Sequence, residues 1–485
     1  MSQPPHASNP PAEPRILQVR NPRTGQADYQ IKVCSTAELE TMAMALRAAQ
    51  PDWRSRGLAE RIQVLQRWSE ALEQSSPDVI EALAGDTGRQ AISEAEVKGL
   101  LGAIQRWTLQ APDLLKTEAR DSVVFPHIRL DTQLVPFPLV GVISPWNFPL
   151  TLSFIDAIPA LLAGCSVLIK PSEVTPRFVE PVAASLAAVP GLARVLRFAT
   201  GDGETGAALI QQVDAVAFTG SVATGRKVGQ AAAAAFIPAF LELGGKDPAL
   251  VLDDADLERA STALLRGSVQ ATGQACQSIE RIYVHQSIFP QFVDRLVEKA
   301  RQVRLTHPEL AGNVLGPLIF DRQADIIRRH LDDAVERGAR IRCGGEILDL
   351  GGGLWLEPTV LTDVNHDMLV MTEETFGPVM PVMAFADDDQ AVALANDTEF
   401  GLSGCVFSQD LDRARRIAEQ IDAGGISIND AALTAMVHEI EKNSFRRSGL
   451  GASRMGPTGL LRFLRHKAMY INQGEVVPIE ALTEK

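Results

Sequence analysis

The sequence predicts an α/β protein with two regions in which helices cover both faces of a parallel sheet. Short apolar segments alternate with helix-like segments over residues 139–243, and a second α/β pattern follows over residues 249–435. The chain has 485 residues, which suggests roughly two to four domains. Hydrophobic residues make up 46% and charged residues 22% of the chain, so a large core can form.

The region before the alternation is expected to be helical and then extended. Residues 45–110 have helical periodicity, and residues 123–136, which contain Pro126 and Pro136, read as extended chain. One helical face is approximated by Ile92, Val97, Leu100, Leu101, Ile104 and Trp107.

The alternation itself predicts five strands separated by four helices. Strands are expected at 139–144, 166–170, 195–200, 215–220 and 239–243, with helices at 150–162, 177–188, 204–212 and 224–236. In such doubly wound sheets, ligands bind beyond the carboxyl ends of the strands. The motifs SPWNFP, KPSE, FTGS and ELGGK follow four of these strands, so we expect a binding site there.

The second region, residues 249–435, alternates less regularly but also contains both helix and strand patterns. Helices are expected at 290–304, 321–337 and 411–421, and a strand at 379–385. The segment AMYIN (468–472) reads as a last strand before an acidic tail.

Charge and cysteine content exclude several functional classes. A net charge of −14 disfavours binding to nucleic acid and to anionic membranes, because both reward clustered Lys and Arg. The Pro-rich N-terminus has no secretory pattern, and no apolar run is long enough to span a bilayer. The five cysteines are scattered, without a C-x-x-C pair, which favours reduced thiols, no metal site and a cytoplasmic location.

Seven motifs in order carry a resemblance that covers nearly the whole chain. They are SPWNFP (144–149), KPSEVTP (170–176), FTGSVATG (218–225), LELGGKDP (241–248), GQACQSIER (273–281), EETFGPVM (373–380) and SGLG (448–451). In this order they resemble the aldehyde dehydrogenase superfamily. The resemblance implies an oxidoreductase that converts an aldehyde to the carboxylic acid with NAD+, through a hemithioacetal and a thioester.

The resemblance also implies a domain organisation with two Rossmann-like domains. Residues 1–117 and 137–248 would form the NAD-binding domain, and residues 249–445 the catalytic domain. Residues 118–136 and 460–485 would form an extended segment that bridges subunits of a homodimer or homotetramer.

Cys276 is expected to be the nucleophile. An isolated cysteine is more often a small buried hydrophobic residue, but here Gly and Gln flank the thiol as in a loop at a helix end. The resemblance assigns the nucleophile to the cysteine of this motif. A free thiol with a pKa near ~8.5 is only slightly ionised at neutral pH, so the site must favour the thiolate. Four cysteines match no such motif and are assigned to packing: Cys34, Cys165, Cys343 and Cys405.

Glu242 is expected to activate the water that hydrolyses the thioester. A lone Glu is usually a solvated surface group, whereas one that closes a buried strand loses water and becomes a better base. The separation from Cys276 is 276 − 242 = 34 residues, which matches the family pattern without an insertion. Members that transfer the acyl group to coenzyme A often lack this glutamate, so its presence favours release of a free acid.

Asn147 has a simple structural interpretation and a functional one. It could be only a turn residue ahead of Pro149. The resemblance instead assigns its side-chain amide to the oxyanion of the tetrahedral adduct, together with the backbone N–H of Cys276.

The NAD site is expected around the four strand ends. GDGETG (201–206) is a literal G-x-G-x-x-G, but Asp202 and Glu204 would place carboxylates beside a pyrophosphate, so we discount it as a standard fingerprint. The resemblance places the pyrophosphate on the turn after FTGS, the adenosine ribose at Lys170 and Glu173, and the nicotinamide ribose and ring at Glu374 and Phe376. The remaining candidate cofactor residues are Ser144, Pro145, Trp146, Ser172, Gly203, Phe218, Thr219, Gly220, Ser221, Gly225, Leu243 and Gly244.

The sequence departs from the family pattern at the expected substrate entrance. Many members carry P-F-G-G-x-K before S-G-x-G, whereas residues 438–451 read HEIEKNSFRRSGLG. Ile155 replaces a common aromatic residue, and residues 430–434 are largely aliphatic, which suggests a moderately apolar tunnel. Arg446 and Arg447 could hold a substrate carboxylate. A solvated basic pair is the more frequent meaning of such a sequence.

Three alternatives remain open at this point. A non-catalytic member of the fold would usually lose the nucleophile. A cysteine hydrolase needs a His beside the thiol, and no motif pairs any of the eight His residues with Cys276. A semialdehyde or CoA-acylating enzyme would differ only in its substrate or acyl acceptor.

Overall fold

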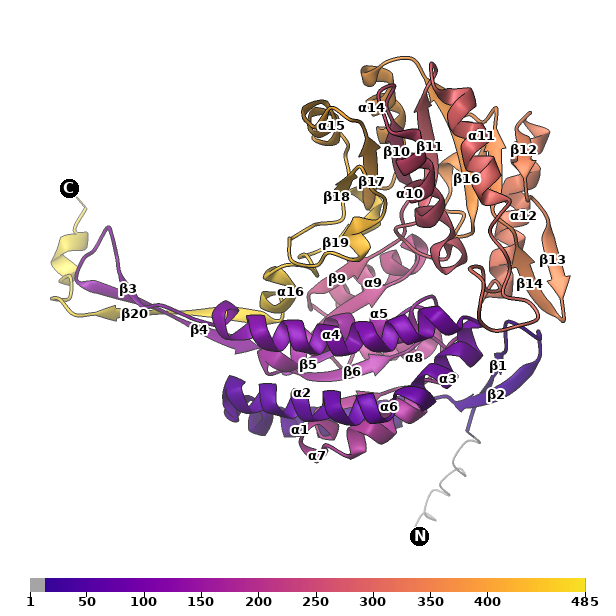
Figure 1. Cartoon of the computed structure of the whole chain (residues 1–485). Helices are drawn as coiled ribbons and strands as arrows, with labels where there is room; N and C mark the ends of the chain where they lie inside the picture. Colours follow the sequence, from indigo (N-terminus) through magenta and orange to yellow (C-terminus); the bar gives the residue numbers. More distant parts are fainter. Residues whose placement is uncertain (1–13, 485) are drawn as a thin grey trace, which may run out of the picture.

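The computed structural model describes residues 14–484 and shows two α/β lobes with an extended arm (Figure 1). The proposed absence of a secretory signal concerns residues 1–13, which lie outside the described residues. No helix among residues 14–484 is both long enough and apolar enough to cross a membrane.

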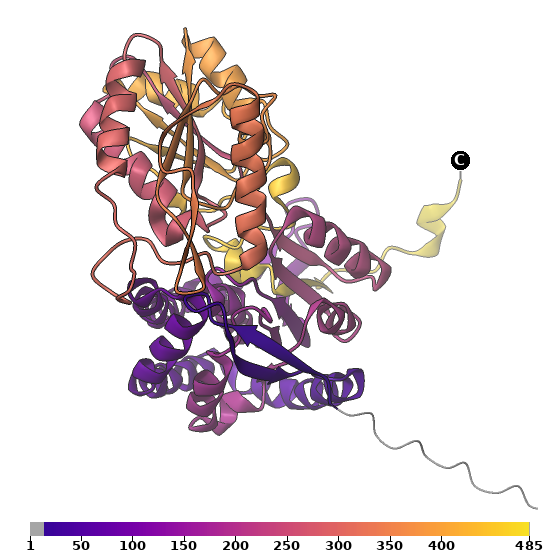
Figure 2. The same ribbon diagram turned by 90° about the vertical axis from the view of Figure 1, so that its right-hand side faces the viewer.

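The N-terminal part is a hairpin followed by four helices. The hairpin consists of β1 (Ile16–Arg20) and β2 (Ala27–Lys32), which pair antiparallel and lie across the lower lobe in Figure 2. The helices are α1 (Thr36–Ser55), α2 (Gly57–Gln74), α3 (Ser76–Thr87) and α4 (Gln90–Leu114). Leu100, Ile104 and Trp107 on α4 are buried, as the predicted helical face requires.

The first sheet has six strands in the order β19-β9-β8-β5-β6-β7, all parallel except β19. Its strands are β5 (Leu139–Ile143), β6 (Ser166–Lys170), β7 (Leu196–Phe198), β8 (Ala215–Thr219), β9 (Ala239–Glu242) and β19 (Gly449–Leu450). Its helices are α5 (Pro149–Ala163), α6 (Val179–Ala187), α7 (Pro190–Ala193), α8 (Gly203–Ile210) and α9 (Val222–Ala234). The sheet grows outward from β5 in both directions, so the strand order reverses between β5 and β8.

The second sheet has seven strands in the order β12-β15-β16-β11-β10-β17-β18, with only β12 antiparallel to its neighbour. Its strands are β10 (Asp247–Val251), β11 (Ile279–His285), β12 (Arg340–Cys343), β15 (Thr359–Thr362), β16 (Val379–Phe385), β17 (Ser403–Phe407) and β18 (Gly425–Ile428). The helices are α10 (Leu257–Val269), η1 (Gln270–Gly273), α11 (Phe289–Ala300), α12 (Asp321–Glu336), α13 (Leu369–Thr372), α14 (Asp388–Asn396) and α15 (Leu411–Ala418). A separate hairpin, formed by β13 (Ile347–Leu350) and β14 (Gly353–Leu356), lies beside this second sheet.

Two doubly wound lobes confirm the predicted fold class. The chain passes from the first sheet to the second between Glu242 and Asp247, inside the ELGGK motif. The domain boundaries drawn from the sequence remain a prediction.

The arm is a three-stranded sheet of β3 (Arg120–Asp121), β4 (Ile128–Pro136) and β20 (Leu464–Asn472). β4 and β20 pair antiparallel over nine residues, from Leu464↔Pro136 to Asn472↔Ile128. The strand expected over 123–136 begins only at Ile128, because a turn precedes it. Short helical segments complete the chain: η2 (Leu433–Ala435), η3 (Arg446–Ser448), α16 (Thr458–Leu461) and η4 (Ile479–Leu482).

A buried cluster of charged side chains links the C-terminal segment to the first lobe. Asp156 on α5 is 1% exposed and pairs with both Arg454 and Arg462. Arg454 also donates to the hydroxyl of Thr219 at 2.7 Å, at the end of β8. One carboxylate therefore pairs with two buried guanidinium groups that belong to a segment about 300 residues away.

We expect Asp156→Ala to destabilise the protein by about 3–5 kcal/mol, the usual cost of leaving a buried charge without its partner. Urea unfolding followed by tryptophan fluorescence measures the change. Asp113→Ala is the control, because the Asp113–Lys116 pair is on the surface and should contribute about 1 kcal/mol or less. Equal unfolding midpoints for the two variants would contradict the proposed role of Asp156.

Candidate active site

The segment that joins the two sheets passes between Glu374 and Cys276, two residues of the predicted site. A Cβ on Gly244 would lie 2.6 Å from a carboxylate oxygen of Glu374, and a Cβ on Gly245 would lie 2.6 Å from the carbonyl oxygen of Cys276. Only glycine allows the backbone this approach on both sides. The two glycines thereby bring Glu242, Cys276 and Glu374 into one region.

The loop before Cys276 is held in an unusual backbone conformation. Ala271 and Thr272 have φ values of 54° and 60°, in the left-handed region. The buried Gln274 anchors the loop, because its side-chain oxygen accepts from the backbone N–H of Ile319 at 2.9 Å and its NH₂ group donates to the carbonyl of Pro317 at 3.1 Å.

Arg89, which the sequence analysis did not single out, connects this loop to the one after β5. Its guanidinium donates to the carbonyl of Ala271 at 3.0 Å and to the carbonyl of Asn147 at 2.5 Å, and it lies over the ring of Phe148. Burial lowers the pKa of Arg89 to about 10, an effect that Glu96 opposes. A lone Arg between two helices reads as a surface residue, so no sequence signal pointed to it.

Asn147 is buried and lies against the loop that carries Cys276. Its side-chain NH₂ group donates to the carbonyl of Gln274 at 2.9 Å. The amide nitrogen carries a second hydrogen. The geometry therefore places an amide donor beside the loop that carries Cys276.

Cys276 and Glu242 line the same cavity, which has a volume of about 510 Å³. Glu242 accepts a hydrogen bond from the hydroxyl of Ser444 at 2.9 Å. Burial raises the pKa of the Cys276 thiol to about 12, with Lys442 opposing this rise and Glu242 adding to it. Cys165 and Cys405 are fully buried, as packing residues would be.

The cavity walls are mostly apolar. Ile155, at the position where the family often has an aromatic residue, is one of the lining residues. Other apolar side chains of the wall are Leu100, Phe148, Leu152, Met436 and Met455. His438 also lines the cavity, but its Nε2 lies 3.1 Å from the carbonyl oxygen of Ala435.

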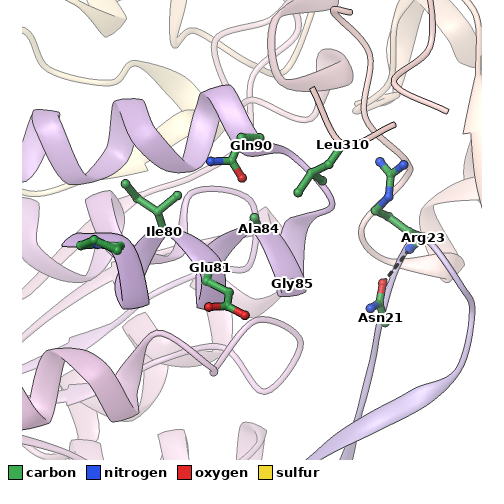
Figure 3. A pocket seen from close by; sticks show the side chains of 9 residues that line it. Asn21, Arg23, Ile80, Glu81, Ala84, Gly85, Gln90 and Leu310 are labelled. Atoms are coloured by element: carbon green, nitrogen blue, oxygen red, sulfur yellow. Dashed lines mark hydrogen bonds between the residues drawn. The ribbon is translucent and has the colours of Figure 1, made fainter. Parts of the chain in front are cut away.

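A larger cavity of about 580 Å³ lies elsewhere, beside α3 and the N-terminal hairpin (Figure 3). Figure 3 shows Asn21, Arg23, Glu81, Gln90 and Leu310 around it. Its lining contains no cysteine and no histidine. We therefore place the site in the smaller cavity, which holds a thiol and a carboxylate.

The expected cofactor residues gather at the carboxyl ends of the first sheet, beside the point where the strand order reverses. Ser144, Pro145 and Trp146 follow β5, and Lys170, Ser172 and Glu173 follow β6. Phe218 and Thr219 end β8, and Gly220 and Ser221 follow it. Gly225 lies on α9, Leu243 and Gly244 follow β9, and Gly203 begins α8. Their convergence at one edge is what a parallel sheet produces.

Two local contacts shape this edge. The ammonium of Lys170 donates to the carboxylate of Glu173 at 2.8 Å, and the Glu173 side chain is 38% exposed. Ser221 caps α9, since its hydroxyl accepts from the backbone N–H of Thr224 at 3.3 Å. The first turn of α9 therefore presents backbone N–H groups to an anion.

The loop of residues 374–376 is supported by another pair that the sequence analysis missed. The buried carboxylate of Glu280 accepts from the backbone N–H groups of Thr375 and Phe376 at 2.8 Å each, and from the ammonium of Lys246 at 2.6 Å. Burial, with Glu280 adding to it, raises the pKa of Glu374 to about 8.

The ring of Phe376 lies 5.4 Å from that of Trp146, edge to face, so the contact joins the two lobes. Phe376 follows the loop that Glu280 holds, whereas Trp146 follows β5 of the first sheet.

The other charged residues considered from the sequence form ion pairs at the surface. Asp202 and Glu204 both pair with Arg15, so the carboxylates of the GDGETG segment are already engaged. Arg446 pairs with Asp422 and Arg447 with Glu399, and neither lines the cavity. Among residues 14–484 no cluster of three or more His, Cys, Asp or Glu could hold a metal ion.

Comparison with known proteins identifies the family. The aldehyde dehydrogenase family model matches residues 10–469. The chain is 37% identical over 451 residues to 4,4'-diapolycopene aldehyde oxidase of a Methylomonas species, covering 91% of this chain and 83% of that protein.

Two solved structures share the fold. The aldehyde dehydrogenase homologue PutA from Anabaena variabilis has 54% identity and a TM-score of 0.94, covering 96% of this chain and 99% of that one. Betaine aldehyde dehydrogenase from Staphylococcus aureus, solved with NAD+, has 29% identity and a TM-score of 0.89, covering 96% and 92%. With a family match over nearly the whole chain and a common fold, the protein belongs to the aldehyde dehydrogenase family and is an oxidoreductase that acts on aldehydes.

Proposed function

We propose that the protein oxidises an aldehyde to its carboxylic acid with NAD+, with Cys276 as nucleophile, Glu242 as general base and Asn147 as oxyanion donor. The observation that carries the proposal is that the thiol and the carboxylate line one cavity, while the Asn147 amide lies against the loop of Cys276. Acyl transfer to coenzyme A is disfavoured by the same observation, since a carboxylate lines the cavity that contains the thiol.

In the proposed reaction, the Cys276 thiolate attacks the aldehyde carbon and forms a hemithioacetal. The Asn147 amide and the backbone N–H of Cys276 stabilise the negative oxygen of the adduct. Bound NAD+ would supply the hydride acceptor, and loss of a hydride from the adduct would leave a thioester on Cys276. Glu242 takes a proton from a water molecule, which attacks the thioester; the acid departs and the thiol is restored.

The residues at the sheet edge fit NAD. Its pyrophosphate suits the N–H groups at the first turn of α9, where Ser221 and Gly220 form the turn. The carboxylates of Glu173 and Glu374 suit ribose hydroxyls, which donate hydrogen bonds. The solved NAD+ complex of the Staphylococcus aureus relative supports this choice of cofactor.

The substrate is proposed to carry an apolar substituent. Apolar side chains dominate the cavity, and the basic pair Arg446–Arg447 does not line it. The name of the Methylomonas relative, which denotes the aldehyde of a long hydrocarbon, supports this class. Measured kcat/KM values over aliphatic, aromatic and ω-carboxylated aldehydes test it, with the carboxylated aldehydes expected to be poorest.

We propose a homodimer or homotetramer assembled through the arm. Exposed apolar side chains gather there, with Val123 92%, Phe125 57% and Tyr470 75% exposed. Single chains rarely leave such groups together in water. The open edge of a short sheet also favours pairing with another chain.

We expect Cys276→Ala to lose NADH production while it still binds NAD+, because no other group can form the thioester. Spectrophotometry measures NADH, and fluorescence titration measures binding. Cys34→Ala is the matched control and should keep wild-type turnover, since Cys34 does not line the cavity. Turnover above about a tenth of wild type in Cys276→Ala would refute the assignment; the loss of a nucleophile ordinarily costs far more.

We expect Glu242→Gln to slow hydrolysis of the thioester by about 10²–10³-fold, within the range of a lost general base. A rapid burst of NADH near one per active site should precede a slow steady state. Mass spectrometry of the quenched enzyme should find the acyl group on Cys276. Slow NADH formation in the first turnover, without an acyl adduct, would give Glu242 a different role.

We expect NAD+ to be preferred over NADP+ by about ten- to a hundredfold in kcat/KM. The 2′-phosphate would bring about two negative charges against the Glu173 carboxylate, a repulsion that exposure partly screens. Glu173→Gln should narrow the difference. An NADP+ preference in the wild type would show that the Lys170–Glu173 pair does not face the ribose.

A further inference from the structure

Lys442 is a buried cation without a partner. Its side chain is 6% exposed, and within residues 14–484 its ammonium nitrogen has no hydrogen-bond partner. Other buried lysines are paired: Lys246 donates to Glu280 at 2.6 Å, and Lys170 donates to Glu173 at 2.8 Å. An ammonium carries three donors and is costly to bury, so an unpaired one requires an explanation.

The backbone around Lys442 is firmly fixed. Its N–H donates to the hydroxyl of Ser453 at 3.2 Å, and the same hydroxyl lies 2.8 Å from its carbonyl oxygen. Two residues further on, the hydroxyl of Ser444 donates to Glu242 at 2.9 Å. The loop that replaces the usual family motif therefore contacts the proposed general base directly.

The side chain of Lys442 packs beside Gly425 and Thr434. A Cβ on Gly425 would lie 3.0 Å from Lys442 Cδ and would also meet the methyl group of Thr434. The hydroxyl of Thr434 donates to the side-chain oxygen of Gln277 at 2.5 Å. Gln277 follows Cys276, so the lysine lies beside a residue that is hydrogen-bonded to the neighbour of Cys276.

The charges around the Cys276 thiol make Lys442 distinctive. The carboxylates of Glu242, Glu374 and Asp247 all raise the pKa of the thiol, and so does burial. Lys442 is the strongest of the influences that lower it, and it also lowers the pKa of Asp247. Three carboxylates against the thiol would otherwise oppose ionisation of the nucleophile.

Arg454 is another buried cation that interacts with the Cys276 thiol, but its charge is engaged. It pairs with Asp156 and donates to the hydroxyl of Thr219. Arg454 also lines the cavity, whereas Lys442 does not. The Lys442 ammonium therefore does not lie in the path of the substrate.

We propose that Lys442 is a positioning residue whose fixed positive charge stabilises the thiolate of Cys276. The inference rests on the proposed role of Cys276 as nucleophile. On ionisation the thiol proton leaves to solvent through the cavity, and Lys442 keeps its own proton. No bond forms between the two side chains.

The test compares alkylation of Cys276 by iodoacetamide in wild type, Lys442→Met and Lys442→Arg, with the full-length protein free of cofactor. Peptide mass spectrometry follows Cys276 separately from the other cysteines, between pH 6 and 9. A unit charge close to a titrating group shifts its pKa by about one to two units, so Lys442→Met should react about ten- to a hundredfold more slowly. Lys442→Arg should stay within about threefold of wild type.

Lys116→Met is the matched control, because Lys116 lies on the surface with 69% of its side chain exposed. It should alkylate at the wild-type rate. If Lys442 had only a structural role, the plots of alkylation rate against pH for wild type and Lys442→Met would not be parallel and displaced by about one to two pH units. A native Lys442→Met that reacts as fast as wild type would overturn the proposal.

Lys442→Gln provides a second neutral variant if the methionine variant does not fold. If neither neutral variant folds, Lys442→Arg decides, and a loss of more than about tenfold in its alkylation rate overturns the proposal. Alkylation needs neither aldehyde nor NAD+. Failure of this inference is therefore distinguishable from failure of the proposed function, which the Cys276→Ala turnover tests.

Discussion

The guanidinium of Arg89 is the contact on which the rest of the site depends. It bonds to the carbonyl of Asn147, after β5, and to the carbonyl of Ala271, in the loop before Cys276. These loops belong to different sheets, and their relative position decides whether an amide donor can face a thiol. The left-handed backbone of Ala271 and Thr272 costs of order 1–3 kcal/mol per residue, which tertiary contacts such as this one must offset.

A second buried group holds the cofactor side of the site in the same way. The carboxylate of Glu280 accepts from the ammonium of Lys246, which lies in the segment between the sheets. It also accepts from the backbone N–H groups of residues 375–376. Lys246 closes the ELGGK motif, so the position of Glu242 and that of Phe376 depend on one ion pair. Gly244 and Gly245 complete the arrangement, since a side chain at either position would displace Glu374 or the Cys276 loop.

Burial helps and hinders the proposed chemistry at once. A site of low dielectric strengthens every hydrogen bond to the developing oxyanion. Burial also raises the pKa of the Cys276 thiol to about 12, and nearby carboxylates add to the effect. A nucleophile in such a place needs a compensating positive charge. The departure from the family motif at residues 438–451 brings the Lys442 charge into this region.

The sequence by itself determined the elements and the identity of the motifs. Buried parallel strands are short apolar runs, and their amphipathic helices have a distinct period, so 166–170 and 379–385 were predicted with their observed bounds. The motifs placed Cys276, Glu242 and Asn147 as candidates. Only the tertiary structure decided what surrounds them. Arg89, Glu280 and Lys442 are single charged residues that resemble solvated surface groups in sequence, and their partners are far along the chain or absent. Their burial follows from how the two sheets pack, which no local pattern encodes.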